Sequence, residues 1–474
     1  MRPPAKRLGG ASSLMGSNPI PSARPGQQAL TEAVTSAALR ITMSMNSYYI
    51  WTIGCQMNKA DSERLSSALE SLGLEPSLAP SEADVVVLNS CVVRQSAEDK
   101  VTGMITSLKP LKLKYPDRIL AVMGCMVGPK TDDLRKTFPY VDVFMPPQRY
   151  EPLIDMLGQR LGIDVEGCIK ELVPPRPNVS TYVPIIHGCD EFCTFCIIPY
   201  RRGRQKSRGV DDIVHEISLL SERGVKEVTL LGQTVDAYGH DLDENVDLGD
   251  LLREVHSISG LSRIRFLTSH PRYMTDSIIQ SVAELPNVCE HFNLPFQAGD
   301  DDILRDMRRS YSSDEYRSLV QGIRDMVPGA SISTDVIVGF PGETDRQFMA
   351  TLDLIRDIRF EKVHAAAYSA RPGTIAFRKA EDNVPLEEKK SRLRALELLQ
   401  ESIVSATNSL LFGKSLEVLV EDFHKGQWRG RTRSDKLVFF RDGVNMVGKV
   451  VDVKISRTGP WSLEGELIGA EAKV

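Results

Sequence analysis

Long hydrophobic runs and an excess of charge of one sign are both missing from this chain of 474 residues. No apolar stretch reaches the roughly 18 residues that a membrane-spanning helix needs, so we expect no association with a membrane. The 58 Lys and Arg nearly balance the 63 Asp and Glu, for a net charge of −5. Because the charges nearly balance, the overall charge of the chain does not indicate binding to nucleic acid. Any such binding must come from a local basic patch.

Cysteine is also scarce, because the whole chain has eight, too few for a disulfide framework at this length. A hydrophobic content of 42% and a charged content of 26% are typical of a globular protein. The length predicts about two to four domains. Three of the cysteines cluster within a few residues. Such clustering without a secretory signal indicates metal or redox chemistry, and therefore a reducing cytoplasm.

Residues 1–44 differ in composition from the rest of the chain. They are rich in Pro, Gly, Ser and Ala, and the first 28 carry no acidic residue. We interpret this segment as a disordered tail or as an over-extended start, with Met43 or Met45 as the true first residue. An organelle transit peptide is the alternative, whereas a secretory signal is not expected because a continuous apolar core is lacking.

Strands and helices alternate over 45–170, which predicts an N-terminal domain with a parallel sheet. Three hydrophobic strands in it end directly at Cys55, Cys91 and Cys125. Ligand sites in such sheets lie beyond the carboxyl ends of the strands, so we expect the three thiols to converge. Three unrelated buried cysteines are the alternative, since free cysteine is commonly buried.

A Pro-rich linker is expected over 171–182, and repeated strand–helix units then run to about residue 408. Repetition over 175–408 predicts a full or partial parallel β/α barrel, whose sites also lie at the carboxyl ends of the strands. Just beyond the first expected strand, YVPIIHG, stands a C-x3-C-x2-C motif formed by Cys189, Cys193 and Cys196. Iron–sulfur clusters usually take four cysteines, so three leave one iron free to bind something else.

Structural zinc, with His187 as the fourth ligand, is the alternative for this motif. It is less favoured because structural zinc sites usually pair two separated knuckles, and no matching C-x2-C follows. Several basic residues follow the motif in the sequence. They form either a solvated loop or a contact for RNA phosphate. The members of this basic run are Arg201, Arg202, Arg204, Lys206 and Arg208.

Residues 409–471 change character to short alternating strands with Gly and Asp turns, which predicts a small OB-like β-barrel. Between Lys425 and Arg441 six basic residues stand against one acidic residue, together with Trp and Phe. Such a hairpin suits RNA phosphates and bases, and an ordinary solvated face is the equal alternative.

The C-x3-C-x2-C motif on a β/α barrel resembles the radical S-adenosylmethionine superfamily. Over nearly all of residues 45–471 the chain is similar to one of its families, the methylthiotransferases, with a C-terminal domain like the RNA-binding TRAM module. The motifs that carry this likeness are GCQMNKADSE, SCVVRQSAEDK, HGCDEFCTFCIIPYRRGR, LGQTVDAYG, TSHP, DVIVGFPGET and YSARPGT. The chain departs from the family pattern at Thr234 and Asp236, where Asn is usual, and at Asn293, where His is common.

The resemblance implies two [4Fe–4S] clusters and S-adenosylmethionine as cofactors. Cys189, Cys193 and Cys196 would hold the cluster that chelates S-adenosylmethionine and generates the radical. Cys55, Cys91 and Cys125 would hold an auxiliary cluster that carries the sulfur to be inserted. Gly232 and Gln233 would contact S-adenosylmethionine. One S-adenosylmethionine would methylate this sulfur and a second would yield the radical, with no protein acid or base needed.

GCQMN and YSARPGT look most like the branch that acts on N6-isopentenyl(dimethylallyl)adenosine at position 37 of tRNA, next to the anticodon. This implies conversion to the 2-methylthio derivative at C2. The anticodon arm of tRNA and an electron donor such as flavodoxin or ferredoxin are the implied partners, and we expect a cytoplasmic monomer. Alternatives are methylthiolation of an aspartate of ribosomal protein S12 or of threonylcarbamoyladenosine in tRNA. A metal-containing RNA-binding protein without enzymatic activity is the alternative of another class.

Overall fold

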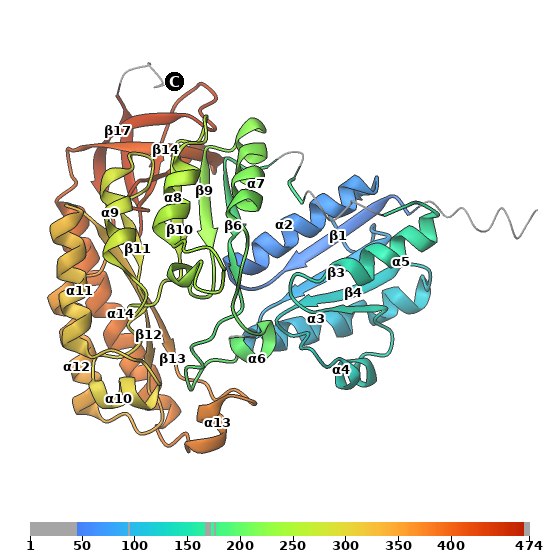
Figure 1. The fold of residues 1–474 in the computed structure, drawn as a ribbon, viewed down its shortest axis with the longest axis horizontal. Coiled ribbons are helices and arrows are strands. Elements are labelled where there is room, and N and C mark those ends of the chain that lie inside the picture. The colour runs from blue at the N-terminus through green and yellow to red at the C-terminus, as the bar shows by residue number, and fades with distance from the viewer. Residues whose placement is uncertain (1–44, 93–94, 166–171, 175–176, 469–474) are drawn as a thin grey trace, which may run out of the picture. The chain divides into compact units, whose positions relative to one another are not determined.

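The computed structural model describes residues 45–92, 95–165, 172–174 and 177–468 (Figure 1). The extension expected over 1–44 lies outside these residues, as does Cys168. Among the helices described, none is at once long enough and apolar enough to cross a membrane.

The N-terminal part forms a parallel sheet with strand order β2-β1-β3-β4-β5, flanked by helices (Figure 1). Every residue of β3 and β4 is buried, as expected for central strands of a parallel sheet. The strands are β1 Ser47–Thr52, β2 Glu75–Pro76, β3 Val85–Ser90, β4 Ile119–Gly124 and β5 Val143–Met145. The helices are α2 Gln56–Ser71, α3 Gln95–Lys114, α4 Asp132–Thr137 and α5 Glu151–Leu161.

The central part is a partial parallel barrel built from two three-stranded sheets, β6-β9-β10 and β11-β12-β13. A single parallel bridge between Ile264 and Val288 links the two sheets. Within the described ranges, β6 pairs only with β9 and β13 only with β12, so the barrel is not closed between them. The strands are β6 Ser180–Pro184, β9 Glu227–Leu231, β10 Arg263–Leu267, β11 His291–Asn293, β12 Ser331–Val338 and β13 Lys362–Ala367.

Helices surround this barrel in the α/β alternation that its sequence predicts. They are α7 Val210–Glu222, α8 Leu248–His256, α9 Asp276–Glu284, α10 Asp301–Asp306, α11 Ser313–Met326, α12 Asp345–Ile358, α13 Ile375–Lys379 and α14 Leu386–Ser409, with a 3-10 turn η1 at Val235–Ala237. One apolar core joins strands and helices, and Phe266, Phe292 and Phe296 are fully buried in it.

Two local expectations around residue 182 are wrong. The linker expected over 171–182 ends earlier, because β6 begins at Ser180, opposite Glu227. The strand expected over YVPIIHG is interrupted after Pro184, a residue with no N–H to continue a ladder. The chain then starts β7, Ile186–His187, which pairs antiparallel with β8, Lys206–Ser207. This pair closes the base of the loop that carries Cys189, Cys193 and Cys196.

The C-terminal part is a closed barrel in the order β14-β15-β16-β18-β17. Its strands are β14 Ser415–His424, β15 Gln427–Thr432, β16 Leu437–Phe440, β17 Val450–Thr458 and β18 Leu463–Leu467. Val418, Val438 and Val453 are fully buried in its core. The predicted fold class is therefore confirmed: an α/β protein with a parallel-sheet domain, a partial β/α barrel and a small β-barrel.

The basic hairpin, for which RNA contact and a solvated face were equal alternatives, forms most of its contacts within the molecule. Arg433 donates to Glu290 at 2.6 Å, and Lys436 donates to Glu361 of the central barrel. Trp428 packs in the core of the small barrel and is 8% exposed. The turn between β15 and β16 thus docks the small barrel on the central one. Of the six basic residues, Lys425 and Arg441 remain exposed.

Candidate functional site

Cys55, Cys91 and Cys125 follow three strands that are neighbours in the sheet, β1, β3 and β4. The register sets Ser90 opposite Gly124, so Cys91 and Cys125 leave the sheet side by side. A Cβ atom built on Gly54 would lie 2.9 Å from the Cβ of Cys91, which shows how near the turn before Cys55 comes. The structure therefore brings the three distant cysteines to one sheet edge, as the sequence predicts.

Glycine precedes a cysteine at two places where the backbone demands it. Gly124 has φ +92°, and a Cβ there would lie 2.5 Å from the carbonyl oxygen of Ser90. Gly188 has φ +65°, and its Cβ would lie 2.1 Å from the carbonyl oxygen of Arg204. Both positions need the left-handed region and a close backbone approach, which only glycine allows at low energy. The Gly-Cys pairs in the sequence are the signal that could have identified these turns.

Cys189, Cys193 and Cys196 lie on one loop that the central barrel holds in several places. The amide of Cys189 donates to the carbonyl of Gly203 at 3.2 Å, which joins the two ends of the loop. The hydroxyl of Thr194 donates to the carbonyl of Asp306 at 2.8 Å. Helix α6, Ile198–Arg202, follows the third cysteine. The loop is therefore anchored before any ligand is added.

Burial makes free thiolates unfavourable in both sets. It raises the pKa of the Cys125 thiol to about 11, and repulsion from Cys91 and Cys55 adds to this, while Arg202 lowers the pKa. Burial likewise raises the pKa of Cys196 to about 12, and repulsion from Cys193 and Cys189 adds to it. Thiolates in either set would repel each other, and a cationic ligand would keep the cysteines deprotonated.

The donor sets fit iron–sulfur clusters better than single metal ions. None of the seven described cysteines is in a disulfide. Over the described ranges, no three His, Cys, Asp or Glu side chains converge on one metal ion. A four-iron cluster does not require this, because its thiolates bind different irons. His187, the alternative zinc ligand, instead has its Nδ1 2.6 Å from Nε2 of Gln148.

Two arginines reach the cysteines, and neither role was expected from the sequence. Arg202 Nε donates to Cys125 Sγ at 3.2 Å, and Arg309 Nη1 donates to Cys193 Sγ at 3.6 Å. Arg202 belongs to the basic run in which contact with RNA phosphate was considered, but its side chain is 3% exposed. Arg208 of the same run pairs with Glu216 at 2.6 Å. Only Arg204 and Lys206 of the run are exposed.

One cavity of about 880 Å³ is lined by members of both cysteine sets, namely Cys55, Cys125 and Cys196. Gly232 and Gln233, the expected contacts of S-adenosylmethionine, line it as well. Packing alone also accounts for Gly232, since a Cβ there would lie 2.3 Å from Cγ2 of Ile186. Members of the two sets thus line the same cavity.

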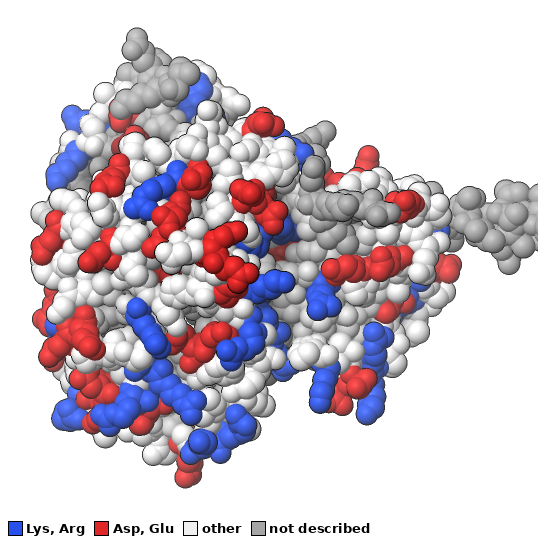
Figure 2. All heavy atoms as spheres, viewed as in Figure 1, with Lys and Arg blue, Asp and Glu red and all other residues white. Residues whose placement is uncertain are grey.

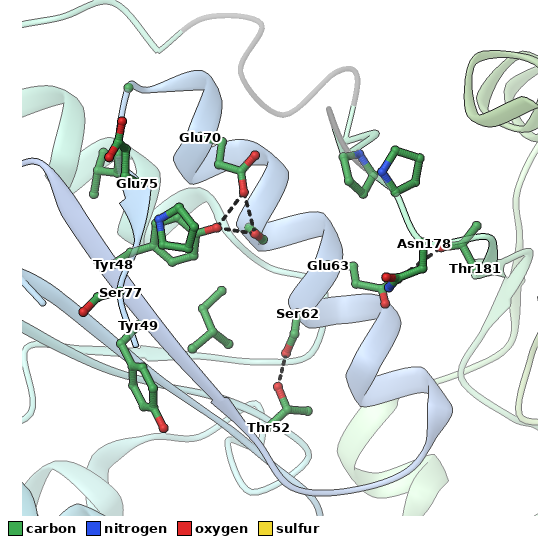
Figure 3. Close-up of a pocket in the computed structure, with 17 residues that line it drawn as sticks. Tyr48, Tyr49, Thr52, Ser62, Glu63, Glu70, Glu75, Ser77, Asn178 and Thr181 are labelled. Atoms are coloured by element: carbon green, nitrogen blue, oxygen red, sulfur yellow. Dashed lines mark hydrogen bonds between the residues drawn. The ribbon is translucent and has the colours of Figure 1, made fainter. Parts of the chain in front are cut away.

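A second cavity, of about 1010 Å³, lies apart from this chemistry (Figure 3). It is bordered by β1, α2 and the segment before β6, and no cysteine lines it. Its polar groups are satisfied by one another, as Figure 3 shows for Tyr48, whose hydroxyl donates to Glu70 at 2.7 Å. The larger cavity is therefore not the reactive one.

Three family models match the chain. They are "Uncharacterized protein family UPF0004" over residues 47–146, "Radical SAM superfamily" over 183–355 and "TRAM domain" over 411–468. A radical S-adenosylmethionine methyltransferase, TsrM from Kitasatospora setae, has a similar fold, with a TM-score of 0.53 and 14% identity. That match covers 71% of this chain and 77% of the other.

Much more similar in sequence are several enzymes named tRNA-2-methylthio-N(6)-dimethylallyladenosine synthase. The one from Roseiflexus sp. is 49% identical and covers 89% of this chain and 89% of its own length. The one from Herpetosiphon aurantiacus is 46% identical over 90% of this chain and 98% of its own length. With its cysteine sets at one cavity and this degree of identity, the chain belongs to the tRNA-2-methylthio-N(6)-dimethylallyladenosine synthase family of radical S-adenosylmethionine methylthiotransferases.

Proposed function

We propose that this protein methylthiolates tRNA, converting N6-dimethylallyladenosine next to the anticodon to its 2-methylthio derivative. The observation that carries the proposal is the shared cavity, which Cys55 and Cys125 of one set and Cys196 of the other all line. A reaction that joins a sulfur group to a radical-activated carbon needs both components in one space. The named activity of the relatives agrees with this arrangement.

The cofactors are an iron–sulfur cluster and S-adenosylmethionine, and we infer two [4Fe–4S] clusters. Cys189, Cys193 and Cys196 would hold one, and Cys55, Cys91 and Cys125 the other. When bound, these groups would supply the methylthio sulfur and the radical that removes hydrogen from C2 of the adenine. Gly232 and Gln233, on the same cavity wall, would position S-adenosylmethionine.

The polynucleotide would lie against the face that carries α6, α10 and α13, where Figure 2 shows basic side chains gathered. Exposed members of this group are Arg204, Arg305, Arg308, Arg378 and Lys379. Such charges bind phosphates without reading sequence, so they would position the anticodon arm while the cavity selects the base. We further infer a cytoplasmic monomer that receives electrons from a donor such as flavodoxin or ferredoxin.

Nucleoside analysis tests the proposal directly. The chain is expressed in a bacterial strain without its own enzyme of this activity, and total tRNA is digested and profiled. We expect the 2-methylthio form of N6-dimethylallyladenosine to appear at the expense of its precursor. An unchanged profile with folded, iron-loaded protein would reject the assignment.

The same strain distinguishes the alternatives. Methylthiolation of threonylcarbamoyladenosine would appear in the same nucleoside profile as a different product. Methylthiolation of ribosomal protein S12 would appear in the mass of that protein. A non-enzymatic metal protein would give no 5′-deoxyadenosine with S-adenosylmethionine and a reductant, whereas our proposal requires it.

A further inference from the structure

Among the described residues, a buried arginine donates a hydrogen bond to a cysteine of each set. Arg202 donates to Cys125 at 3.2 Å and Arg309 donates to Cys193 at 3.6 Å. The side chain of Arg202 is 3% exposed, and Arg309 as a residue is 9% exposed. A guanidinium does not lose its proton in proteins, so each set has a permanent positive charge at one of its sulfurs.

The positive charge of Arg202 is compensated by a carboxylate next to the sulfur of Cys125. Its Nη2 lies 3.1 Å from Oδ2 of Asp61, whose side chain is fully buried. Burial raises the pKa of Asp61 and the charge of Arg202 lowers it, so the two groups are electrostatically coupled. Together they form an ion pair with no net charge next to Cys125.

The charge of Arg309 has no such compensation. Its other partners are neutral: the hydroxyl of Tyr311 at 2.8 Å and the carbonyl of Pro295 at 2.7 Å. In the described part of the chain, no carboxylate forms an ion pair with it. The carboxylates of Asp236 and Glu191 lie near this set, but in the described residues neither forms an ion pair with Arg309. Arg309 therefore contacts the set of Cys189, Cys193 and Cys196 without a carboxylate paired to its guanidinium.

We propose that Arg309 makes the site formed by Cys189, Cys193 and Cys196 easier to reduce than the site formed by Cys55, Cys91 and Cys125. Reduction adds one negative charge, which a nearby uncompensated cation and hydrogen bonds to sulfur stabilise. One electron passes from an external one-electron reductant, and no bond forms and no proton moves in that step. Arg309 acts through Cys193 and is a positioning residue.

This inference rests on the proposed function, because it assumes that each set binds a cluster. The inference says which site receives the electron. An electron entering the shared cavity would reach the site that activates S-adenosylmethionine and not the site that holds the sulfur. The Arg202–Asp61 pair would keep the second site from competing for this electron. Without such a difference, electrons would be divided between two sites that line the same space.

The experiment is a redox titration of reconstituted protein, followed by electron paramagnetic resonance. Replacing Cys55, Cys91 and Cys125 by Ala isolates one site, and replacing Cys189, Cys193 and Cys196 by Ala isolates the other. In the first background, Arg309→Met is expected to make reduction at least tenfold less favourable, which is a downward shift of about 59 mV for one electron. Arg309→Lys keeps the charge and should recover more than half of this shift.

In the second background, Asp61→Asn uncovers the charge of Arg202 and should shift the other site upward. Arg64→Gln is the matched control, since Arg64 is on the same helix α2 as Asp61 and pairs with Glu216 at 3.0 Å, and among the described residues no hydrogen bond joins it to a cysteine. It should leave the potential of this site unchanged.

An unshifted potential in Arg309→Met, or in Asp61→Asn should the first variant not fold, would overturn the inference. So would a native protein in which the site of Cys55, Cys91 and Cys125 reduces first. Failure of the proposed function has a separate signature, since native protein would then bind fewer than two clusters or form no 5′-deoxyadenosine.

Discussion

The two cysteine sets reach the same cavity by opposite routes. Cys189, Cys193 and Cys196 lie within eight residues on one anchored loop. Cys55, Cys91 and Cys125 come from three strands and meet only when β1, β3 and β4 pair in register. The first set depends on local chain geometry and the second on the whole N-terminal sheet. A motif can therefore identify the first set, whereas the second is recognised only through topology.

Removing either set entirely gives the largest expected difference. Each triple Cys→Ala variant should abolish the methylthio product and lower the iron content from about eight to about four per chain. Only loss of Cys189, Cys193 and Cys196 should also abolish 5′-deoxyadenosine, because the other set does not generate the radical. Iron analysis and chromatography of the nucleoside measure both effects. Equal loss of 5′-deoxyadenosine in both variants would contradict the division of roles.

The glycines before the cysteines allow each set to be broken singly. Gly188→Ala places a Cβ 2.1 Å from a backbone oxygen, and Gly124→Ala places one 2.5 Å from another. The left-handed backbone adds about 1–2 kcal/mol to the clash. We expect Gly188→Ala to lose the irons of the loop set and Gly124→Ala those of the strand-end set, as iron analysis and paramagnetic resonance would show.

Gly73→Ala is the control for these two variants. Gly73 has φ +85° but no atom within 4 Å of the added Cβ, so it tests the backbone effect without the clash. It should retain all iron. Loss of iron from Gly73→Ala would show that general destabilisation, and not the local turn, accounts for the other two results.

The difference between the sets also explains which features of the site could be predicted from the sequence. Hydrophobic runs ending at Cys55, Cys91 and Cys125 were enough to predict their convergence, because neighbouring parallel strands share an edge. The arginines could not be predicted, since Arg309 and Cys193 are 116 residues apart and nothing local links them. For the same reason the ion pair of Arg433 with Glu290, 143 residues away, could not be predicted, and contact with RNA and a solvated face were the two alternatives for its hairpin.

The ion pair at the strand-end set should carry more stability than the arginine at the loop set. Arg202→Met leaves Asp61 as a buried charge without its partner, which typically destabilises a protein by about 3–5 kcal/mol. Arg309→Met leaves no buried carboxylate without its partner, so it should destabilise the protein less. Thermal unfolding of apoprotein compares the two variants. The double variant Arg202→Met with Asp61→Leu should recover most of the loss, and a double variant no better than the single one would contradict the pairing.

The smallest expected effect concerns the hydroxyl of Thr234, which contacts a cysteine of the loop set. Thr234 Oγ1 lies 3.4 Å from Cys189 Sγ, whereas Cys55 in the other set faces Oδ1 of Asn58 at 3.4 Å, an acceptor that cannot donate to a thiolate. Thr234→Val keeps the shape and removes the donor. A hydrogen bond of this kind contributes about 0.5–1.5 kcal/mol, so the loop site should become harder to reduce by less than about tenfold. Thr234→Ser should restore the native potential. Because the hydroxyl carries no charge, a shift as large as that of Arg309→Met would mean that hydrogen bonding, and not charge, separates the two sites.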